Sequence, residues 1–132
     1  MSARILIVED EILVALEIQS ILHELGYETI GIAPDLATAR GYFDREIDLA
    51  LVDLNLRDGL TGPQIGATLG SNGVTVLFVT ANPRLLGSGI AGAIGVITKP
   101  TDEEMVRSAV LYALSVRSGR PATPPPYLKL FG

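Results

Sequence analysis

The stretch LALVDLNL, residues 49–56, is an apolar run that is interrupted by one aspartate, Asp53. An apolar run of this length is typical of a strand that is buried on both faces of a sheet. Asp53 lies where this strand ends and a loop begins, so a charged group follows directly on a buried segment. Outward from this stretch, apolar runs alternate with helix-like segments, and this alternation decides the fold class.

Four further apolar runs have the features of strands: RILIV (4–8), YETIGIA (27–33), GVTVLFVT (73–80) and VIT (96–98). Five segments with helical spacing or capping signals lie between and after them: 10–26, 35–45, 63–69, 81–95 and 102–118. The fourth helix is expected to be short or loosely held, because glycine recurs through its last residues. The pattern predicts an α/β fold: a doubly wound, five-stranded parallel sheet, flavodoxin-like with the order 2-1-3-4-5, and helices on both faces.

Length and composition limit the class of protein. The chain has 132 residues, enough for one domain, and its 48% hydrophobic and 19% charged residues indicate a globular chain without a run long enough to span a membrane. Fifteen acidic against ten basic residues give a net charge of −5, which argues against direct nucleic-acid binding. The absence of cysteine excludes disulfides and thiolate sites. No signal peptide is evident at the start, so we expect a cytoplasmic protein.

The C-terminal segment differs in composition from the rest. We divide the chain into a domain of residues 1–118 and a proline-rich tail of residues 119–132, GRPATPPPYLKLFG. The favoured interpretation of the final YLKLF (127–131) is a disordered end. The alternative is an apolar strand or latch that docks on its own domain or on a second subunit.

Polar residues terminate four of the five predicted strands: Glu9 and Asp10, Asp53, Thr80, and Lys99. In a parallel sheet with right-handed crossovers, these carboxyl ends lie along one edge, where ligands bind. Three crowded carboxylates repel one another unless a cation lies among them, and oxygen ligands suit Mg²⁺. An aspartate beside Mg²⁺ can attack phosphorus, while a lysine neutralises the phosphoryl oxygens and a hydroxyl donates a hydrogen bond. The edge therefore predicts a phosphoryl-acceptor site.

Each of these residues also has a structural interpretation on its own. Asp53 could form a turn, Thr80 could be an ordinary strand residue, and Lys99 could be a solvated charge. Because four strand ends would then need four separate explanations, we prefer one joint site. The single histidine, His23, lies in the middle of the first predicted helix and is interpreted as a solvated residue outside the site.

Four segments together resemble the receiver domain of two-component response regulators, over about residues 3–117. They are ILIVEDE (5–11), LALVDLNL (49–56), VLFVTA (76–81) and VITKP (96–100). The resemblance implies phosphorylation by a histidine kinase or a histidine phosphotransfer protein, and an output through altered binding of a downstream protein partner. No attached effector is expected within this length, and the chain is expected to be no enzyme beyond its own phosphorylation and dephosphorylation. The last helix is a candidate surface for a homodimer.

The resemblance also implies individual roles. Asp53 would be the phosphoacceptor, Thr80 the switch hydroxyl and Lys99 the lysine that contacts the phosphoryl group, with a cis bond before Pro100. The implied Mg²⁺ ligands are Glu9 (through water), Asp10, Asp53 and the backbone carbonyl of Asn55.

Three features depart from the family pattern. Arg57 stands in the loop where the family often has proline, and Val96 stands three residues before the lysine, where Tyr or Phe is usual. The segment 81–95 is poor in helix formers. FVTANPRLL (78–86) is similar to receivers of the general stress pathway of alphaproteobacteria, or to receivers that act alone.

Two other classes of function remain open. A phosphatase with an aspartate nucleophile, similar to haloacid dehalogenases, would share the acids, the hydroxyl and the lysine. Such enzymes carry the nucleophile on the first strand in a D-x-D pattern, whereas here Asn55 follows Asp53 at plus two on the third strand. The other class is a pseudo-receiver, a docking module that no longer uses phosphate, for which Val96 and the weak fourth helix are the arguments.

Overall fold

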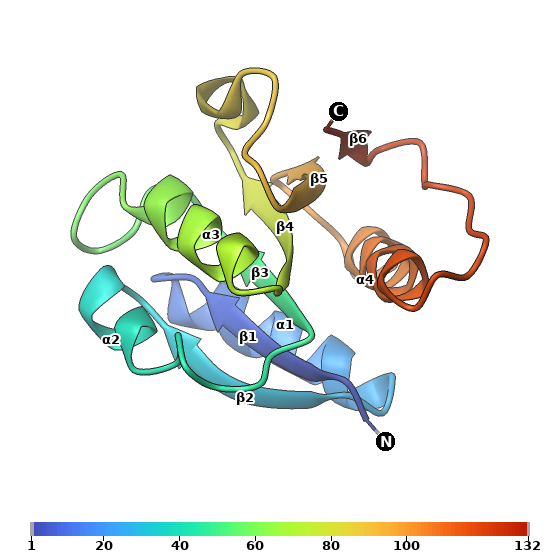
Figure 1. Ribbon diagram of the computed structural model, residues 1–132, viewed down its shortest axis with the longest axis horizontal. Coiled ribbons are helices and arrows are strands. Elements are labelled where there is room, and N and C mark those ends of the chain that lie inside the picture. The colour runs from blue at the N-terminus through green and yellow to red at the C-terminus, as the bar shows by residue number, and fades with distance from the viewer. Residues whose placement is uncertain (1, 132) are drawn as a thin grey trace.

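The computed structural model describes residues 2–131 and consists of one six-stranded sheet in the order β2-β1-β3-β4-β5-β6, with helices on both faces (Figure 1). The strands are β1 (Arg4–Val8), β2 (Glu28–Ala33), β3 (Leu49–Val52), β4 (Thr75–Thr80), β5 (Ala93–Thr98) and β6 (Lys129–Leu130). The first five are parallel, so the predicted fold class and the order 2-1-3-4-5 are confirmed.

Helices cover both faces of the sheet. They are α1 (Ile12–Glu24), α2 (Leu36–Arg40), α3 (Gly62–Ser71) and α4 (Glu103–Arg117), with a four-residue 3-10 helix, η1 (Pro83–Leu86). Apolar residues of α1 and α4 pack with one set of strand side chains, and those of α2 and α3 pack with the other. Alternate residues of β1 enter the two cores, Ile5 and Ile7 one core and Leu6 and Val8 the other. This is why the central strands read as unbroken apolar runs.

The structure differs from the sequence prediction in two helical regions. The helix expected over 35–45 ends at Arg40, and Gly41 and Tyr42 continue it only as turns. In place of a helix over 81–95 there is η1, followed by glycines with positive φ at 87, 89 and 92. These glycines favour a turn over a helix, and β5 starts at Ala93, three residues before the predicted strand.

The preferred interpretation of the tail as a disordered end is wrong. Lys129 and Leu130 of the tail form β6, which pairs antiparallel with β5. Leu128, before β6, is buried, and the Phe131 N–H donates to the Ile94 carbonyl at 3.1 Å. The alternative interpretation, a strand docked on its own domain, describes the structure.

Within residues 2–131, no helix combines the length and the apolar character that a membrane span requires.

Candidate functional site

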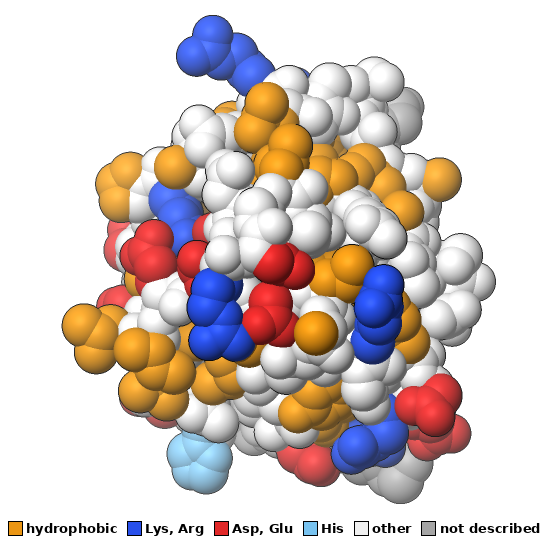
Figure 2. Space-filling model, turned by 90° about the vertical axis from the view of Figure 1, so that its left-hand side faces the viewer, with side chains coloured by type: hydrophobic (Ala, Val, Ile, Leu, Met, Phe, Trp, Pro, Cys, Tyr) orange, Lys and Arg blue, Asp and Glu red, His pale blue; other side chains and the backbone are white. Residues whose placement is uncertain are grey.

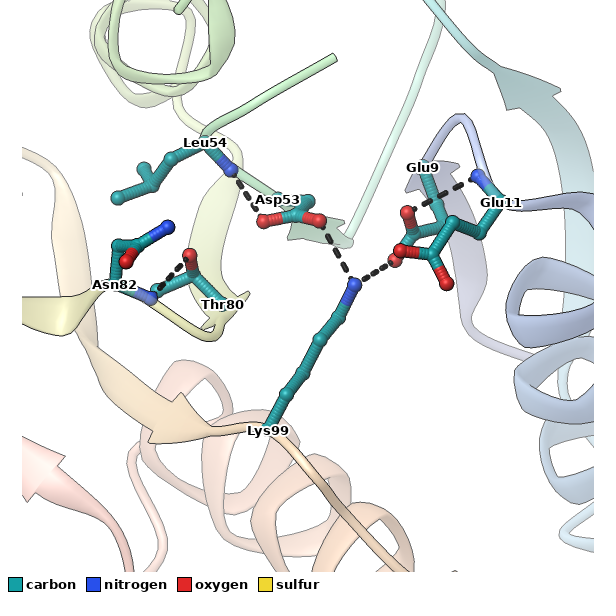
Figure 3. A network of polar contacts seen from close by, with 7 residues as sticks. All are labelled: Glu9, Glu11, Asp53, Leu54, Thr80, Asn82 and Lys99. Atoms are coloured by element: carbon teal, nitrogen blue, oxygen red, sulfur yellow. Dashed lines mark hydrogen bonds and ion pairs between the residues drawn. The ribbon is translucent and has the colours of Figure 1, made fainter.

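The polar residues at the strand ends meet at one edge of the sheet, as the sequence predicted. Glu9 and Asp10 follow β1, Asp53 follows β3, Thr80 ends β4 and Lys99 follows β5. Figure 3 shows the Lys99 side chain placing its ammonium between two carboxylates. Lys99 Nζ lies 2.7 Å from Glu9 Oε1 and 2.8 Å from Asp53 Oδ2. One lysine therefore joins the ends of three strands.

Burial distinguishes these groups from ordinary surface charges. Glu9, Asp53 and Thr80 are only 3%, 7% and 0% exposed, whereas Asp10 is exposed. Buried carboxylates are rare unless they are paired. Here the pairing is supplied by Lys99, whose own backbone N–H donates to the Thr80 carbonyl at 2.9 Å. The site is thus a partly buried polar cluster that the sheet itself holds together.

Burial and neighbouring charges shift the pKa values of Glu9 and Lys99. Burial raises the pKa of the Glu9 carboxyl, and the hydrogen bond and charge of Lys99 offset this only in part. Burial lowers the pKa of the Lys99 ammonium. The hydrogen bonds with Asp53 and Glu9, and their negative charges, outweigh the effect of burial, so the pKa of Lys99 is raised. Lys99 therefore stays charged at neutral pH.

The carboxylates of the site fit a divalent cation. One oxygen of each of Glu9, Asp10 and Asp53 lies within 4.8 Å of the others. A cavity of about 290 Å³ opens beside them, and Asp10, Asp53, Asn55, Thr80 and Lys99 are among the residues that line it. An all-oxygen donor set next to open space suits Mg²⁺, which keeps several of its waters.

Asp53 and Thr80 are held by backbone N–H groups, and the sequence did not predict these contacts. The Leu54 N–H donates to Asp53 Oδ1 at 2.7 Å, which leaves Oδ2 to Lys99. The Asn82 N–H donates to Thr80 Oγ1 at 3.1 Å, so the hydroxyl proton of Thr80 is free for another acceptor. Gly62, the first residue of α3, donates its N–H to the Leu54 carbonyl at 3.0 Å and brings α3 against this backbone.

In the loop after Asp53, the family often has proline. In this chain Arg57 is present instead, and an ion pair connects it to Asp35. The Arg57 guanidinium pairs with Asp35, the residue that caps α2, and the Arg57 N–H donates to the Pro34 carbonyl at 3.2 Å. Asp58 accepts from the Leu36 N–H at 3.0 Å. Two loops that are 22 residues apart in sequence are therefore fastened together beside the site.

This fastening gives a pH-dependent prediction. The hydrogen bond from Arg57, with further bonds from Thr38, lowers the pKa of Asp35 from 3.8 to about 2. Such a carboxyl stabilises the fold fully above the pKa of the unfolded chain and loses this contribution as the pH falls towards about 2. We expect Arg57→Ala to lower the urea midpoint at pH 6, and the difference from wild type to shrink at pH 3. Arg120→Ala, in the exposed tail, is the control; a difference that grows at pH 3 would contradict the assignment.

Val96 lies where the family usually has an aromatic residue, and its surroundings contain an aromatic group from elsewhere. Val96 is buried in the same apolar cluster as Phe78 and Phe131, whose rings are 6.5 Å apart between centroids. Phe131 comes from the tail, 35 residues after Val96 in sequence. Only the apolar ending of the tail signalled this contact in the sequence. His23 is exposed on α1 and outside the cluster, as predicted.

Comparison with known proteins agrees with this geometry. The sequence model of the response regulator receiver domain matches residues 5–111. The chain belongs to this family. A curated relative, the phyllosphere-induced regulator PhyR of Methylorubrum extorquens, is 31% identical over 118 residues, which are 86% of this chain and 44% of that protein. The receiver spans less than half the length of this relative.

Two solved structures of PhyR proteins are similar to this chain. The solution structure of the PhyR receiver domain of Erythrobacter litoralis is 31% identical, with a TM-score of 0.78 over 92% of this chain and 97% of that one. A PhyR mutant from Bartonella quintana, described as an anti-anti-sigma factor, is 27% identical, with a TM-score of 0.78 over 90% of this chain and 51% of that one.

Proposed function

We propose that this receiver accepts a phosphoryl group on Asp53 from a histidine kinase or a histidine phosphotransfer protein, in a reaction that requires Mg²⁺. The observation that carries the proposal is the cluster of Glu9, Asp10 and Asp53 beside an open cavity, with Lys99 2.8 Å from Asp53. A single buried aspartate would not require the two further acids, the lysine and the hydroxyl that surround it.

The chain's own groups suit each part of the transfer. An Asp53 carboxylate oxygen forms the new bond to phosphorus while the phosphorus–nitrogen bond of the donor phosphohistidine breaks, and the electron pair leaves with the imidazole nitrogen. Lys99 neutralises a phosphoryl oxygen, and the free proton of the Thr80 hydroxyl donates to another. Mg²⁺, held by Glu9, Asp10, Asp53 and the Asn55 carbonyl, would supply further charge neutralisation at the phosphoryl oxygens.

The proposal is tested by intact mass spectrometry after incubation with acetyl phosphate. We expect the wild-type chain to gain about 80 Da, the mass of one phosphoryl group, when Mg²⁺ is present and not when EDTA replaces it. If no adduct forms, titration with beryllium fluoride, which mimics the acyl phosphate, separates a short-lived adduct from a site that takes none. Absence of both responses would reject the proposal.

The output of the phosphorylated chain is proposed to be altered binding of a protein partner. PhyR of Bartonella quintana is described as an anti-anti-sigma factor. This likeness supports the proposal that the receiver takes part in the same kind of signalling and acts by binding a protein. The net charge of −5 argues against DNA as the partner. We further propose that the chain has no catalytic turnover apart from its own phosphorylation and dephosphorylation, and that it acts in the cytoplasm.

A phosphate-independent docking module is the second candidate function. It is favoured by η1, which is only four residues long, and by Val96 in place of an aromatic residue. The intact cluster of acids, hydroxyl and lysine favours phosphorylation instead. If the affinity for the partner is the same for wild type and Asp53→Asn, with and without a phosphodonor, the docking module would be supported.

Apolar side chains beside the site suggest where the donor protein binds. Figure 2 shows the side where the strands end, with acidic side chains near its centre and apolar ones towards its margin. Ile12, Leu13 and Leu16 of α1 are exposed, Leu13 by 79%, and Ile12 and Leu13 follow closely on Asp10. A contiguous exposed apolar surface of this kind commonly marks a protein interface.

This surface gives a prediction that separates binding from chemistry. Leu13→Glu is expected to reduce phosphorylation by a phosphohistidine protein at least about tenfold, since one buried apolar contact is worth about 1.5–3 kcal/mol. Phosphorylation by acetyl phosphate should stay unchanged, because this small donor needs no protein interface. Leu111→Glu is the matched control, because Leu111 is exposed on α4 beside Ala3, at the opposite end of β1. Equal loss with both donors would place Leu13 in the site itself.

A further inference from the structure

The outer edge of β5 is covered by the chain's own tail. Gly95 and Val96 pair antiparallel with Leu130 and Lys129, and the Phe131 N–H donates to the Ile94 carbonyl at 3.1 Å. Figure 1 shows β6 beside β5, at the end of a long connection from α4. Without this segment, β5 would present a row of unpaired backbone groups, which is a template for another strand.

Two apolar anchors flank β6, one on each side of the sheet. Leu128 is only 6% exposed and joins the core that contains α1 and α4. Phe131 packs with the other core, beside Phe78. Lys129 and Leu130, between the anchors, are exposed. The edge of β5 therefore recognises a leucine and an aromatic residue that are three positions apart in an extended segment.

Glycines in the domain make room for this segment. A Cβ at Gly95 would lie 2.4 Å from the Lys129 carbonyl oxygen, and a Cβ at Gly89 would lie 2.6 Å from the Phe131 ring. A side chain at Gly95 would meet backbone and could not be relieved by a rotamer change. Both β5, at Gly95, and the loop before it, at Gly89, thus leave room for a docked strand.

The tail fills this space incompletely. β5 runs to Thr98, yet β6 pairs only with Gly95 and Val96. The Leu128 N–H donates to the Pro125 carbonyl at 3.1 Å, so a proline turn leads the chain away before it can pair with Ile97 and Thr98. Most of the connecting residues from 118 to 126 are exposed. Ordering such a connection opposes docking. The tail is held by Leu128, Phe131 and a minimal strand, together with Tyr127, whose hydroxyl donates to the Glu104 carbonyl at 3.1 Å.

We propose that the edge of β5 is a strand-docking surface for a partner protein and that the tail is its built-in competitor. The partner would present an extended segment with a leucine and a large aromatic residue three positions apart, and without proline before the leucine. Such a segment could pair with β5 as far as Thr98. A second copy of the tail offers the same contacts as the tethered one but lacks its high effective concentration, so it would not replace it. The proposal concerns a surface outside the phosphoacceptor cluster and requires no phosphorylation.

The test uses the full chain and a synthetic peptide, TVTYLKLFG, in which TVT replaces the three prolines before the tail sequence. Phe131→Ala weakens the tail and leaves the edge of β5 intact. We expect the peptide, labelled with a fluorophore, to bind Phe131→Ala at least tenfold more tightly than wild type in anisotropy titrations. Leu128→Ala is a second variant with the same expected result. Leu130→Ala, which removes an exposed side chain of the same strand, is the matched control and should bind like wild type.

Adding Gly95→Ala to Phe131→Ala locates the binding. It should abolish binding of the peptide, because its Cβ fills the space of the docked backbone, while thermal unfolding shows that the double variant is folded. Three results would overturn the proposal: no binding to either weakened tail, binding that survives Gly95→Ala, or a wild-type dimer with exchanged tails in light scattering. The last result would make a second copy the occupant.

Discussion

Asp53→Asn is expected to abolish phosphorylation while leaving the receiver folded. Asparagine has the same shape as aspartate but lacks the anionic oxygen that attacks phosphorus. Its side-chain oxygen can still accept from the Leu54 N–H, and Lys99 keeps its bond to Glu9 at 2.7 Å. In the acetyl phosphate assay with Mg²⁺, the variant should show no gain of about 80 Da, and its thermal unfolding should remain a single cooperative transition.

A second acid near the site controls for nonspecific modification. Asp58 lies in the loop that follows Asp53, where it accepts from Leu36 and Thr61 and not from Lys99. Asp58→Asn should therefore be phosphorylated like wild type. A gain of mass in Asp53→Asn would assign the phosphoryl group to another residue. If neither variant gains mass, a disturbed loop, and not the missing nucleophile, would explain the loss of phosphorylation.

The strands and the site were predictable because both follow from short-range patterns. The apolar run before Asp53 indicated a strand buried on both faces, and β3 has that burial. Once the strands were parallel, their carboxyl ends had to share one edge, which brought Glu9, Asp53 and Lys99 together. The direct bonds from Lys99 to both carboxylates depend on side-chain geometry, and no spacing in the sequence reports that.

The remaining features depend on contacts between distant residues. Arg57 could be recognised as an unusual loop residue, yet its pairing with Asp35 depends on how two loops meet. The tail showed its apolar character, but its strand exists because Gly95 leaves room for Lys129 on β5. The missing fourth helix was foreseen in part, because glycines after η1 disfavour helix. That one of these glycines, Gly89, also leaves room for Phe131 of the tail could not be read from composition.

Gly62 is the clearest case of a site residue that the sequence did not reveal. It is the first residue of α3, and a Cβ there would lie only 1.9 Å from the Asp53 carbonyl oxygen and 2.5 Å from the Leu54 Cα. Both atoms belong to the backbone, so no rotamer change relieves the overlap. The close approach also allows the Gly62 N–H to bond the Leu54 carbonyl at 3.0 Å. The bare backbone of Gly62 therefore fixes the position of the peptide that carries Asp53, the proposed phosphoacceptor.

Gly62→Ala is accordingly expected to be strongly destabilising, by about 3 kcal/mol, the upper part of the usual range for overpacking. To admit the methyl group, either the start of α3 or the peptide after Asp53 must move, and the second change also displaces the Asp53 carboxylate. Urea unfolding should show the lower stability, and acetyl phosphate should label the folded fraction more slowly than wild type. Gly41→Ala is the matched control: its φ is −65° and its nearest atom, the Thr38 carbonyl oxygen, is 3.4 Å away. That variant should change stability by no more than about 1 kcal/mol. Equal stability of the two variants would mean that α3 does not need the bare backbone of Gly62 to hold Asp53 in place.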